Sequence, residues 1–241
     1  GTSTQFPYVG DSGAPVSTAV TYTVTDSANL TATCTVVVTV VDDEAPVLQD
    51  CSGLNVSGTT DHDRSYATIG AGSVSLVFPT VQDNSGEQLT VVAKVGTVDV
   101  TNAFRFPYVG SAGTATTTVT YTASDSAGLA SSCNVTVIVT DDQAPDLQSC
   151  STLGVSGTTD TGVSYGTIGT GNVTLTYPSV SDNSGEALAV VATVGGVGVG
   201  TSTQFPYVGD SGAPVSTAVT YTVTDSANLT ATCTVVVTVV D

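Results

Sequence analysis

Apolar and polar residues alternate along several stretches of the chain, with the period of two that is typical of β-strands. In the segment 133–140 (CNVTVIVT), Cys133, Val135, Val137 and Val139 share one face. In the segment 118–123 (TVTYTA), every second residue is Thr. The short DSAG sequence between these two segments is typical of a turn that joins antiparallel strands. Because no helical period of useful length appears, the pattern predicts an all-β protein.

The pattern also repeats along the chain. Residues 1–42 recur letter for letter at 200–241, an offset of 199 residues in a chain of 241. A looser repeat has half that period, since DDEAPVLQDC at 42–51 returns as DDQAPDLQSC at 141–150, and FPYVG starts at Phe6, Phe106 and Phe205. The chain therefore consists of units of about 100 residues.

Each unit contains about seven short strands, which is the size of an immunoglobulin-like β-sandwich. We expect tandem immunoglobulin-like domains at 42–140 and 141–241. Residues 1–41 are expected to be the C-terminal half of a preceding unit. A half-sandwich leaves a core face uncovered, so we expect preceding chain or another molecule to complete it.

The segment 106–139 (FPYVGSAGTATTTVTYTASDSAGLASSCNVTVIV) resembles the second half of a hyalin repeat (HYR) domain. The resemblance rests on a Phe-Pro turn, a V-x-Y-x-x-x-D strand, a hairpin of small residues, and a Cys that precedes alternating valines. The opening DDxAPxLxxC resembles the first strand of that family, although Ser52 and Ser151 stand where the family often has Pro. The resemblance implies two HYR-like domains of an extracellular adhesion or matrix protein, with no catalytic residues to transfer.

Composition excludes several functions. The chain has 3 basic and 21 acidic residues, for a formal charge of −18, so it lacks the basic patch that nucleic acids or anionic lipids require. No apolar stretch approaches the ~20 residues of a membrane span. His62 and Arg64 lie in a loop (DHDRSY) whose counterpart, DTGVSY, keeps neither residue. We therefore expect no enzymatic activity.

The five cysteines recur at equivalent positions of the sequence repeat. We expect disulfides between Cys51 and Cys133 and between Cys150 and Cys233, with the partner of Cys34 in the absent half of its unit. Buried free thiols are the alternative, and a metal site would need closer Cys or His spacing. Disulfides would indicate an extracellular or cell-surface location.

Only 10% of the residues are charged, which is low for a soluble surface. Sugar or contacts between copies would explain this composition. Five N-x-S/T triplets are candidate N-glycosylation sites, although a chain rich in Ser and Thr also forms such triplets by chance. They lie at Asn29, Asn55, Asn134, Asn172 and Asn228.

Acidic residues gather where one unit ends and the next begins. Cadherin-like chains stiffen such junctions with calcium, so the junction residues are calcium candidates, to which the loop pairs Asp83-Asn84 and Asp182-Asn183 could add ligands. The alternative is that they are solvated turn residues. Asp26, Asp125 and Asp225 precede tight turns, where we expect them to cap backbone N–H groups. The junction candidates are Asp42, Asp43, Glu44, Asp141 and Asp142.

The sequence thus favours a structural protein of an extracellular fibre or cell-surface filament, in which the chain's partner is itself, head to tail or in a tandem array. The alternative is a stalk or spacer of a cell-surface adhesin or receptor. No cofactor is expected other than N-glycans and calcium.

Overall fold

The computed structural model describes residues 3–8, 15–70, 73–108, 113–207 and 215–241. This part of the chain is β-structure with short 3-10 helices, which confirms the predicted all-β fold class of tandem immunoglobulin-like β-sandwiches. By its packing in space, the chain divides into two compact units, called unit 1 and unit 2 below, whose bounds differ from those of the sequence repeats. Unit 1 comprises residues 1–56, 75–104 and 117–137, and unit 2 comprises 57–74, 105–116 and 138–241. The domain boundaries expected at 42 and 141 stay a prediction.

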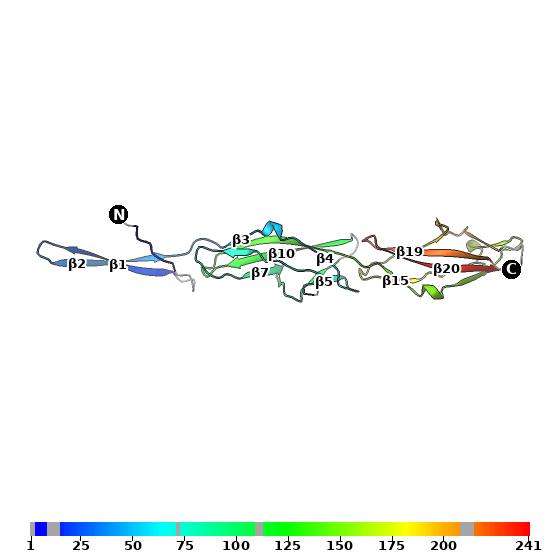
Figure 1. Ribbon diagram of the computed structural model, residues 1–241, viewed down its shortest axis with the longest axis horizontal. Coiled ribbons are helices and arrows are strands. Elements are labelled where there is room, and N and C mark those ends of the chain that lie inside the picture. Colours follow the sequence, from blue (N-terminus) through cyan, green and yellow to red (C-terminus); the bar gives the residue numbers. More distant parts are fainter. Residues whose placement is uncertain (1–2, 9–14, 71–72, 109–112, 208–214) are drawn as a thin grey trace. The chain divides into compact units, whose positions relative to one another are not determined.

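The N-terminal strands of unit 1 form an antiparallel hairpin, drawn in blue in Figure 1. They are β1 (Val16–Thr25) and β2 (Thr31–Val40), with Tyr22 opposite Cys34. The turn between them is closed by the backbone N–H of Asn29, which donates to the carbonyl of Asp26 at 3.1 Å. Asn29 has a φ of 63°, a left-handed conformation that Asn tolerates better than most residues.

The identical letters near the C-terminus fold in the same register. They form β19 (Val215–Thr224) and β20 (Thr230–Val240), with Tyr221 opposite Cys233. In unit 2 these strands are the middle of a five-stranded sheet with the order β13-β20-β19-β16-β17. The added strands are β13 (Val155–Thr158), β16 (Val191–Val194) and β17 (Val197–Gly198).

A second five-stranded sheet has the equivalent order β4-β11-β10-β7-β8. The strands keep the spacing of the sequence repeat. They are β4 (Val56–Thr59), β7 (Val91–Val95), β8 (Val98–Asp99), β10 (Thr114–Ser124) and β11 (Ala130–Thr140).

Short antiparallel pairs complete the fold. Unit 1 contains β3 paired with β6, and unit 2 contains β5 with β9, β12 with β15, and β14 with β18. Their bounds are β3 (Val47–Gln49), β6 (Thr80–Gln82), β5 (Tyr66–Thr68), β9 (Arg105–Pro107), β12 (Asp146–Gln148), β15 (Ser179–Ser181), β14 (Tyr165–Thr167) and β18 (Gln204–Pro206). The 3-10 helices are η1 (Cys51–Gly53), η2 (Cys150–Thr152) and η3 (Ile168–Thr170). The FPYVG segments lie partly outside the described residues.

Alternation along the strands builds the core of unit 2. Val219, Tyr221 and Val223 on β19 are buried, as are Val235, Val237 and Val239 on β20. The Tyr221 hydroxyl donates to the carbonyl of Thr176 at 2.9 Å, which satisfies the one polar group of a buried ring. Burial of each such side chain stabilises the fold by about 1.5–3 kcal/mol.

Disulfides join the beginning and end of each repeat as the sequence predicts. Cys51 is bonded to Cys133 within unit 1, with a Cα–Cα distance of 6.4 Å, and Cys150 to Cys233 within unit 2, at 6.3 Å. Both distances are in the usual range for disulfides. Cys34 is a free, exposed cysteine. Across the described residues, the structure has no helix with the length and apolar character needed to cross a membrane.

Candidate metal centre

Two groups of three aspartates have the same composition in the two units. In unit 1, Asp42, Asp83 and Asp125 each place a carboxylate oxygen within 4.8 Å of the other two. In unit 2, Asp141, Asp182 and Asp225 do the same. We call these groups the first and second Asp triads. Their members are related by the sequence repeat, at offsets of 99, 99 and 100 residues.

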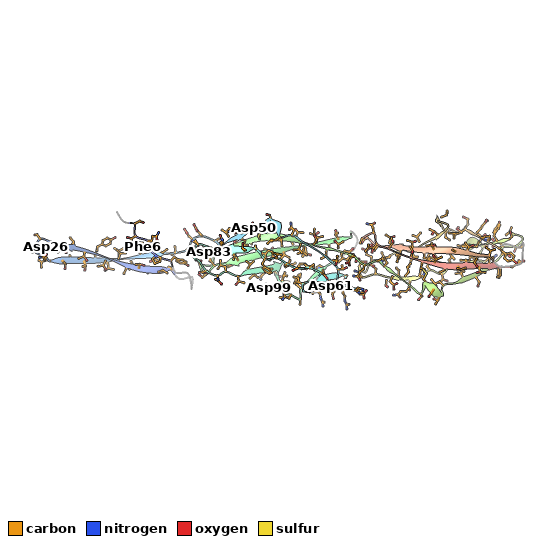
Figure 2. The ribbon with its side chains drawn as sticks, viewed as in Figure 1. Phe6, Asp26, Asp50, Asp61, Asp83 and Asp99 are labelled. Carbon is orange, nitrogen blue, oxygen red and sulfur yellow. A yellow bond between two sulfur atoms is a disulfide. The ribbon has the colours of Figure 1, made fainter. Side chains whose placement is uncertain are left out.

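Strand ends position each triad. In the second triad, Asp141, Asp182 and Asp225 directly follow strands β11, β15 and β19. In the first triad, Asp83 and Asp125 directly follow β6 and β10, and Asp42 comes two residues after β2. Figure 2 labels Asp83 at its strand end. Since a strand end is where backbone pairing stops, its side chain can turn from the sheet toward the loops.

Hydrogen bonds fix one oxygen of each carboxylate in the second triad. Asp141 Oδ1 accepts bonds from Asn183 Nδ2 at 2.9 Å, the Gln143 backbone N–H at 3.1 Å, and Thr60 Oγ1 at 3.3 Å. Asp182 Oδ2 accepts from the backbone N–H and the hydroxyl of Ser184. Asp225 Oδ1 accepts from the backbone N–H of Leu229 at 2.8 Å.

The first triad repeats this arrangement. Asp42 Oδ1 accepts from the Glu44 backbone N–H at 3.2 Å, and Asp83 Oδ2 accepts from the backbone N–H and hydroxyl of Ser85. Asp125 Oδ1 accepts from the Leu129 backbone N–H at 2.8 Å. Equivalent backbone and serine donors therefore orient the carboxylates of both triads, and Asp141 accepts additional bonds from Asn183 and Thr60.

The second oxygen of all six carboxylates is buried and has no hydrogen-bond partner in the structure. These atoms are Asp42 Oδ2, Asp83 Oδ1, Asp125 Oδ2, Asp141 Oδ2, Asp182 Oδ1 and Asp225 Oδ2. Asp141 is 3% exposed, Asp225 6% and Asp125 9%. A buried carboxylate oxygen without a partner is costly and calls for a compensating group.

The charges of the second triad also favour a bound cation. Burial raises the pKa of Asp225 above its usual value, and the neighbouring charges of Asp182 and Asp141 raise it further. The two ion pairs found among the described residues, Lys94–Asp99 and His62–Asp63, involve no triad carboxylate. A bound divalent cation would offset two of the three like charges.

A further oxygen and a surface hollow lie beside the second triad. Asn183 Oδ1 is buried without a hydrogen-bond partner, while its Nδ2 holds Asp141. Asp182 and Asn183 also line a surface hollow of about 370 Å³, together with Asp63 and Gln143. The donor set is therefore entirely oxygen, the ligand type that hard divalent cations prefer.

The structure separates the acidic residues that the sequence grouped together. Asp42 and Asp141 belong to the triads, whereas Asp43, Glu44 and Asp142 are exposed and outside them. The expected capping role of the hairpin aspartates is confirmed, since Asp125 and Asp225 accept from Leu129 and Leu229, and Asp26 from Ala28 and Leu30. His62 is exposed and contacts Asp63 at 2.9 Å.

Sequence reasoning missed that the two hairpin aspartates, Asp125 and Asp225, are also triad members. Their position before tight turns predicts a capping role, and that role by itself does not indicate a ligand. The repeat did carry a signal, because an aspartate occupies all three triad positions in both repeats, although the neighbouring pair Asp43 and Asp142 is shared as well.

The candidate glycosylation sites differ in their surroundings. Asn29, Asn55, Asn134 and Asn228 are exposed. Asn172 is half-buried, and its Nδ2 donates to the carbonyl of Thr159 at 3.2 Å and to Asp160 Oδ1 at 2.8 Å.

No protein-family model matches the chain. Similar solved structures include extracellular cadherin domains 3–6 of protocadherin gamma B2, with 14% identity, a TM-score of 0.40, and coverage of 94% of this chain and 60% of that one. Mouse cadherin-23 EC22–24 has 15% identity and a TM-score of 0.34, over 94% of this chain and 75% of that one. Drosophila N-cadherin EC1–4 has 10% identity and a TM-score of 0.27, over 94% and 59%. The chain thus spans about three fifths of the protocadherin structure, and at these identities the likeness concerns the fold alone.

Proposed function

We propose that this chain is a segment of an extracellular structural array, a fibre or cell-surface filament built from tandem disulfide-bonded β-sandwich units. The observation that carries the proposal is that one repeat duplicates the other strand by strand, disulfide by disulfide and triad by triad. Repeats of this kind build extended structures by stacking like units, with the chain itself as partner. The two disulfides support an extracellular location.

We propose Ca²⁺ as the ligand of both Asp triads. Three carboxylates supply at least three of the six to eight oxygen ligands that Ca²⁺ takes, with water and the Asn183 carbonyl oxygen available for more at the second triad. Mg²⁺ fits less well, because it demands near-octahedral geometry and loses its water reluctantly. Extracellular calcium modules bind with dissociation constants of roughly 10⁻⁴–10⁻³ M, which sets the expected affinity.

We also propose that the chain carries N-glycans at the candidate sites, and that it is a HYR-like protein. Exposed acceptors at four of the five positions support glycosylation, and sugars would add polar surface to a chain with only 10% charged residues. The HYR assignment rests on the sequence motifs alone, as do the domain boundaries at 42–140 and 141–241 and the half unit at 1–41.

A stalk or spacer of a cell-surface adhesin is the second candidate function. It uses the same units and the same cation sites, because bound Ca²⁺ would stiffen a stalk as well as a fibre. The difference between the two candidates lies in the assembled form of the native protein.

Electron microscopy of the native material separates the two functions. Regular fibres with an axial repeat support the array, whereas discrete rods that each end in a distinct head support the stalk and contradict the fibre. Isothermal titration of the full chain with CaCl₂ tests the cation sites. We expect two sites per chain and weaker binding of MgCl₂; no heat of binding, together with an unchanged melting temperature, would contradict calcium.

A further inference from the structure

The chain has three basic residues, and one of them, Arg64, is exposed in a loop. The other two lie in paired strands. Lys94 is in β7, between β10 and β8, and Arg105 is in β9, opposite Thr68. The Arg105 guanidinium also lies 4.6 Å from the centre of the Tyr66 ring. Because proteolytic nicking concentrates in exposed loops, a protease that cuts after Arg or Lys would find its target in the folded chain at Arg64.

The peptide bond after Arg64 belongs to a tight turn. The Arg64 backbone N–H donates to the carbonyl of Asp61, which Figure 2 labels, at 3.0 Å. Asp63, directly before Arg64, has a φ of 56°, in the left-handed region. In a serine protease, the carbonyl oxygen of the bond to be cut is bound by the N–H donors of the oxyanion hole. The loop must therefore leave this turn before a protease can cut it.

Two side chains of the following sequence repeat, Gln143 and Asn183, hold the turn closed. Gln143 Oε1 accepts from the Asp63 backbone N–H at 2.8 Å, and its Nε2 donates to the Asp61 carbonyl at 3.1 Å. Asn183 Nδ2 donates to the Arg64 carbonyl oxygen at 3.3 Å. Asn183 thus binds the same oxygen that the oxyanion hole of a protease must bind.

We propose that the Arg64–Ser65 peptide bond is a cleavage site for a secreted serine protease with an acidic specificity pocket, and that Asn183 keeps this site closed. Loss of the contact between Asn183 and the loop opens the site. Hydrolysis then consumes one water molecule: the Arg64 carbonyl carbon gains the hydroxyl group, and the Ser65 nitrogen gains the proton. The counterpart of Arg64 in the other repeat is Val163, so the site occurs once in the two repeats.

A cut at this bond would nick the chain without releasing a fragment. Cys51 lies before the bond and Cys133 after it, and the two cysteines are joined in a disulfide. The fragments 1–64 and 65–241 therefore stay together until that disulfide is reduced. Cleavage changes the connection between the two repeats and leaves the chain covalently continuous.

The closed site lies beside the second Asp triad. Asn183 Nδ2 also donates to Asp141 Oδ1 at 2.9 Å, and Asn183 Oδ1 is buried without a hydrogen-bond partner. A Ca²⁺ ion that binds Asn183 Oδ1 would hold this side chain in place and slow the cleavage. The effect of calcium rests on the proposed cation sites, whereas the cleavage site itself does not.

The test is limited proteolysis of the full chain with trypsin, followed by gels with and without reductant and by mass spectrometry. We expect the first cut after Arg64, giving one disulfide-linked species that separates into the fragments 1–64 and 65–241 on reduction. Arg64→Gln should slow the first cut by at least about tenfold, because the remaining targets lie in paired strands that open less often.

Two amide side chains give a matched pair of variants. Asn183→Ala removes the donor to the Arg64 carbonyl and should raise the rate of this cut about threefold to tenfold, the effect of one lost hydrogen bond on the open population. Gln148 lines the same surface hollow but donates to Ser181 Oγ at 3.0 Å, so Gln148→Ala should be cut at the parent rate. Saturating CaCl₂ should slow the cut in the parent and not in Asn183→Ala. A short arginine peptide controls for effects of calcium on trypsin.

Three results would overturn the inference: a first cut at Lys94 or Arg105, equal rates of cutting at all three basic residues, or equal rates for Asn183→Ala and Gln148→Ala. Failure of the calcium sites is seen separately. If calorimetry finds no calcium binding while Asn183→Ala is cut faster, the calcium proposal is wrong and the closed cleavage site stands. If calcium binds and Asn183→Ala is cut at the parent rate, the role of Asn183 is wrong.

Discussion

Asn183 donates a hydrogen bond from Nδ2 to Oδ1 of Asp141 at 2.9 Å, across 42 residues of sequence. The bond holds one oxygen of the carboxylate, while Asp141 Oδ2 is buried without a hydrogen-bond partner. In a metal site, protein donors of this kind orient the carboxylate and leave its other oxygen available to the ion. The same division between the two oxygens recurs in all six triad aspartates, and it leads to the first prediction.

Replacing one triad member should remove one bound calcium ion. Asp182→Asn takes away a charged ligand of the second triad, so titration calorimetry should find one site per chain in place of two. At a calcium concentration about 100 times the dissociation constant, each site contributes roughly 2.7 kcal/mol to the free energy of unfolding, and the variant should lose this calcium-dependent part.

Asp142→Asn is the matched control for that experiment. It removes the same charge from an exposed residue next to Asp141 but outside the triad, and should keep both sites. The prediction is wrong if Asp182→Asn retains two sites, or if the two variants weaken calcium binding equally.

The disulfide in unit 2 should account for a large part of its stability. Cys150 and Cys233 are separated by 83 residues, and in the chain-entropy model a loop of this length stabilises the fold by about 4–5 kcal/mol. Urea unfolding of the Cys150→Ala/Cys233→Ala double variant should show this loss. Cys34→Ser removes only a free, exposed thiol and should change the unfolding free energy by less than about 0.5 kcal/mol. Equal midpoints for the parent and the double variant would refute the prediction.

Acid should weaken the loop that Asp160 organises. Hydrogen bonds from Thr167 and Thr170 lower the pKa of Asp160 from 3.8 to about 2. Because the folded pKa is depressed, the stabilisation is fully present above pH 3.8 and is lost as the pH falls through about 2. The difference in melting temperature between the parent and Asp160→Asn should therefore shrink across this range.

Thr170→Val provides a second measurement of the same effect. It removes a donor that lies 2.7 Å from Asp160 Oδ1, so it should raise the pKa of Asp160 and move the acid transition to higher pH. A parent–variant difference that stays constant from neutral pH to about pH 2 would count against this role of Asp160.

Glycan occupancy should differ among the five candidate sites. The glycan is attached to the side-chain amide nitrogen, and at Asn172 this atom already donates two hydrogen bonds in a half-buried position. We expect high occupancy at the exposed sites Asn29, Asn55, Asn134 and Asn228, and low occupancy at Asn172. Mass spectrometry of the enzymatically deglycosylated peptides, in isotopically heavy water, measures each site. Unmodified Asn at all five would end the glycan explanation of the low charge.

Much of the fold could be predicted because it follows from the local alternation of apolar and polar residues and from the sequence repeat. Alternation placed Val119 and Tyr121 on one face, and both are completely buried. The repeat predicted the pairs Cys51–Cys133 and Cys150–Cys233 because each complete repeat has one cysteine near its start and one near its end. The alternation depends only on neighbouring residues, and the cysteine pairing depends only on where the cysteines fall within each repeat.

The candidate metal centre could be predicted only in part. Asp42 and Asp141 stood out as members of acidic runs, but so did Asp43 and Asp142, which are exposed. The acidic composition alone does not show which of two adjacent aspartates belongs to a triad. The side chains of adjacent residues in extended chain point in opposite directions, so only one of the two can face the site. The position of Asp225 before a tight turn already accounted for an aspartate there. The sequence therefore did not show that its carboxylate lies close to those of Asp141 and Asp182.

The sequence by itself determined the strands, the period of the repeat and the disulfide pairs, since these follow from alternation and from copies of the same letters. Only the tertiary structure decided which carboxylates meet, because three strand ends far apart in sequence converge there. It also decided the state of two identical hairpins. Tyr22 and Tyr221 have the same local sequence, yet one is exposed and the other buried, because burial depends on the segment that packs against the face.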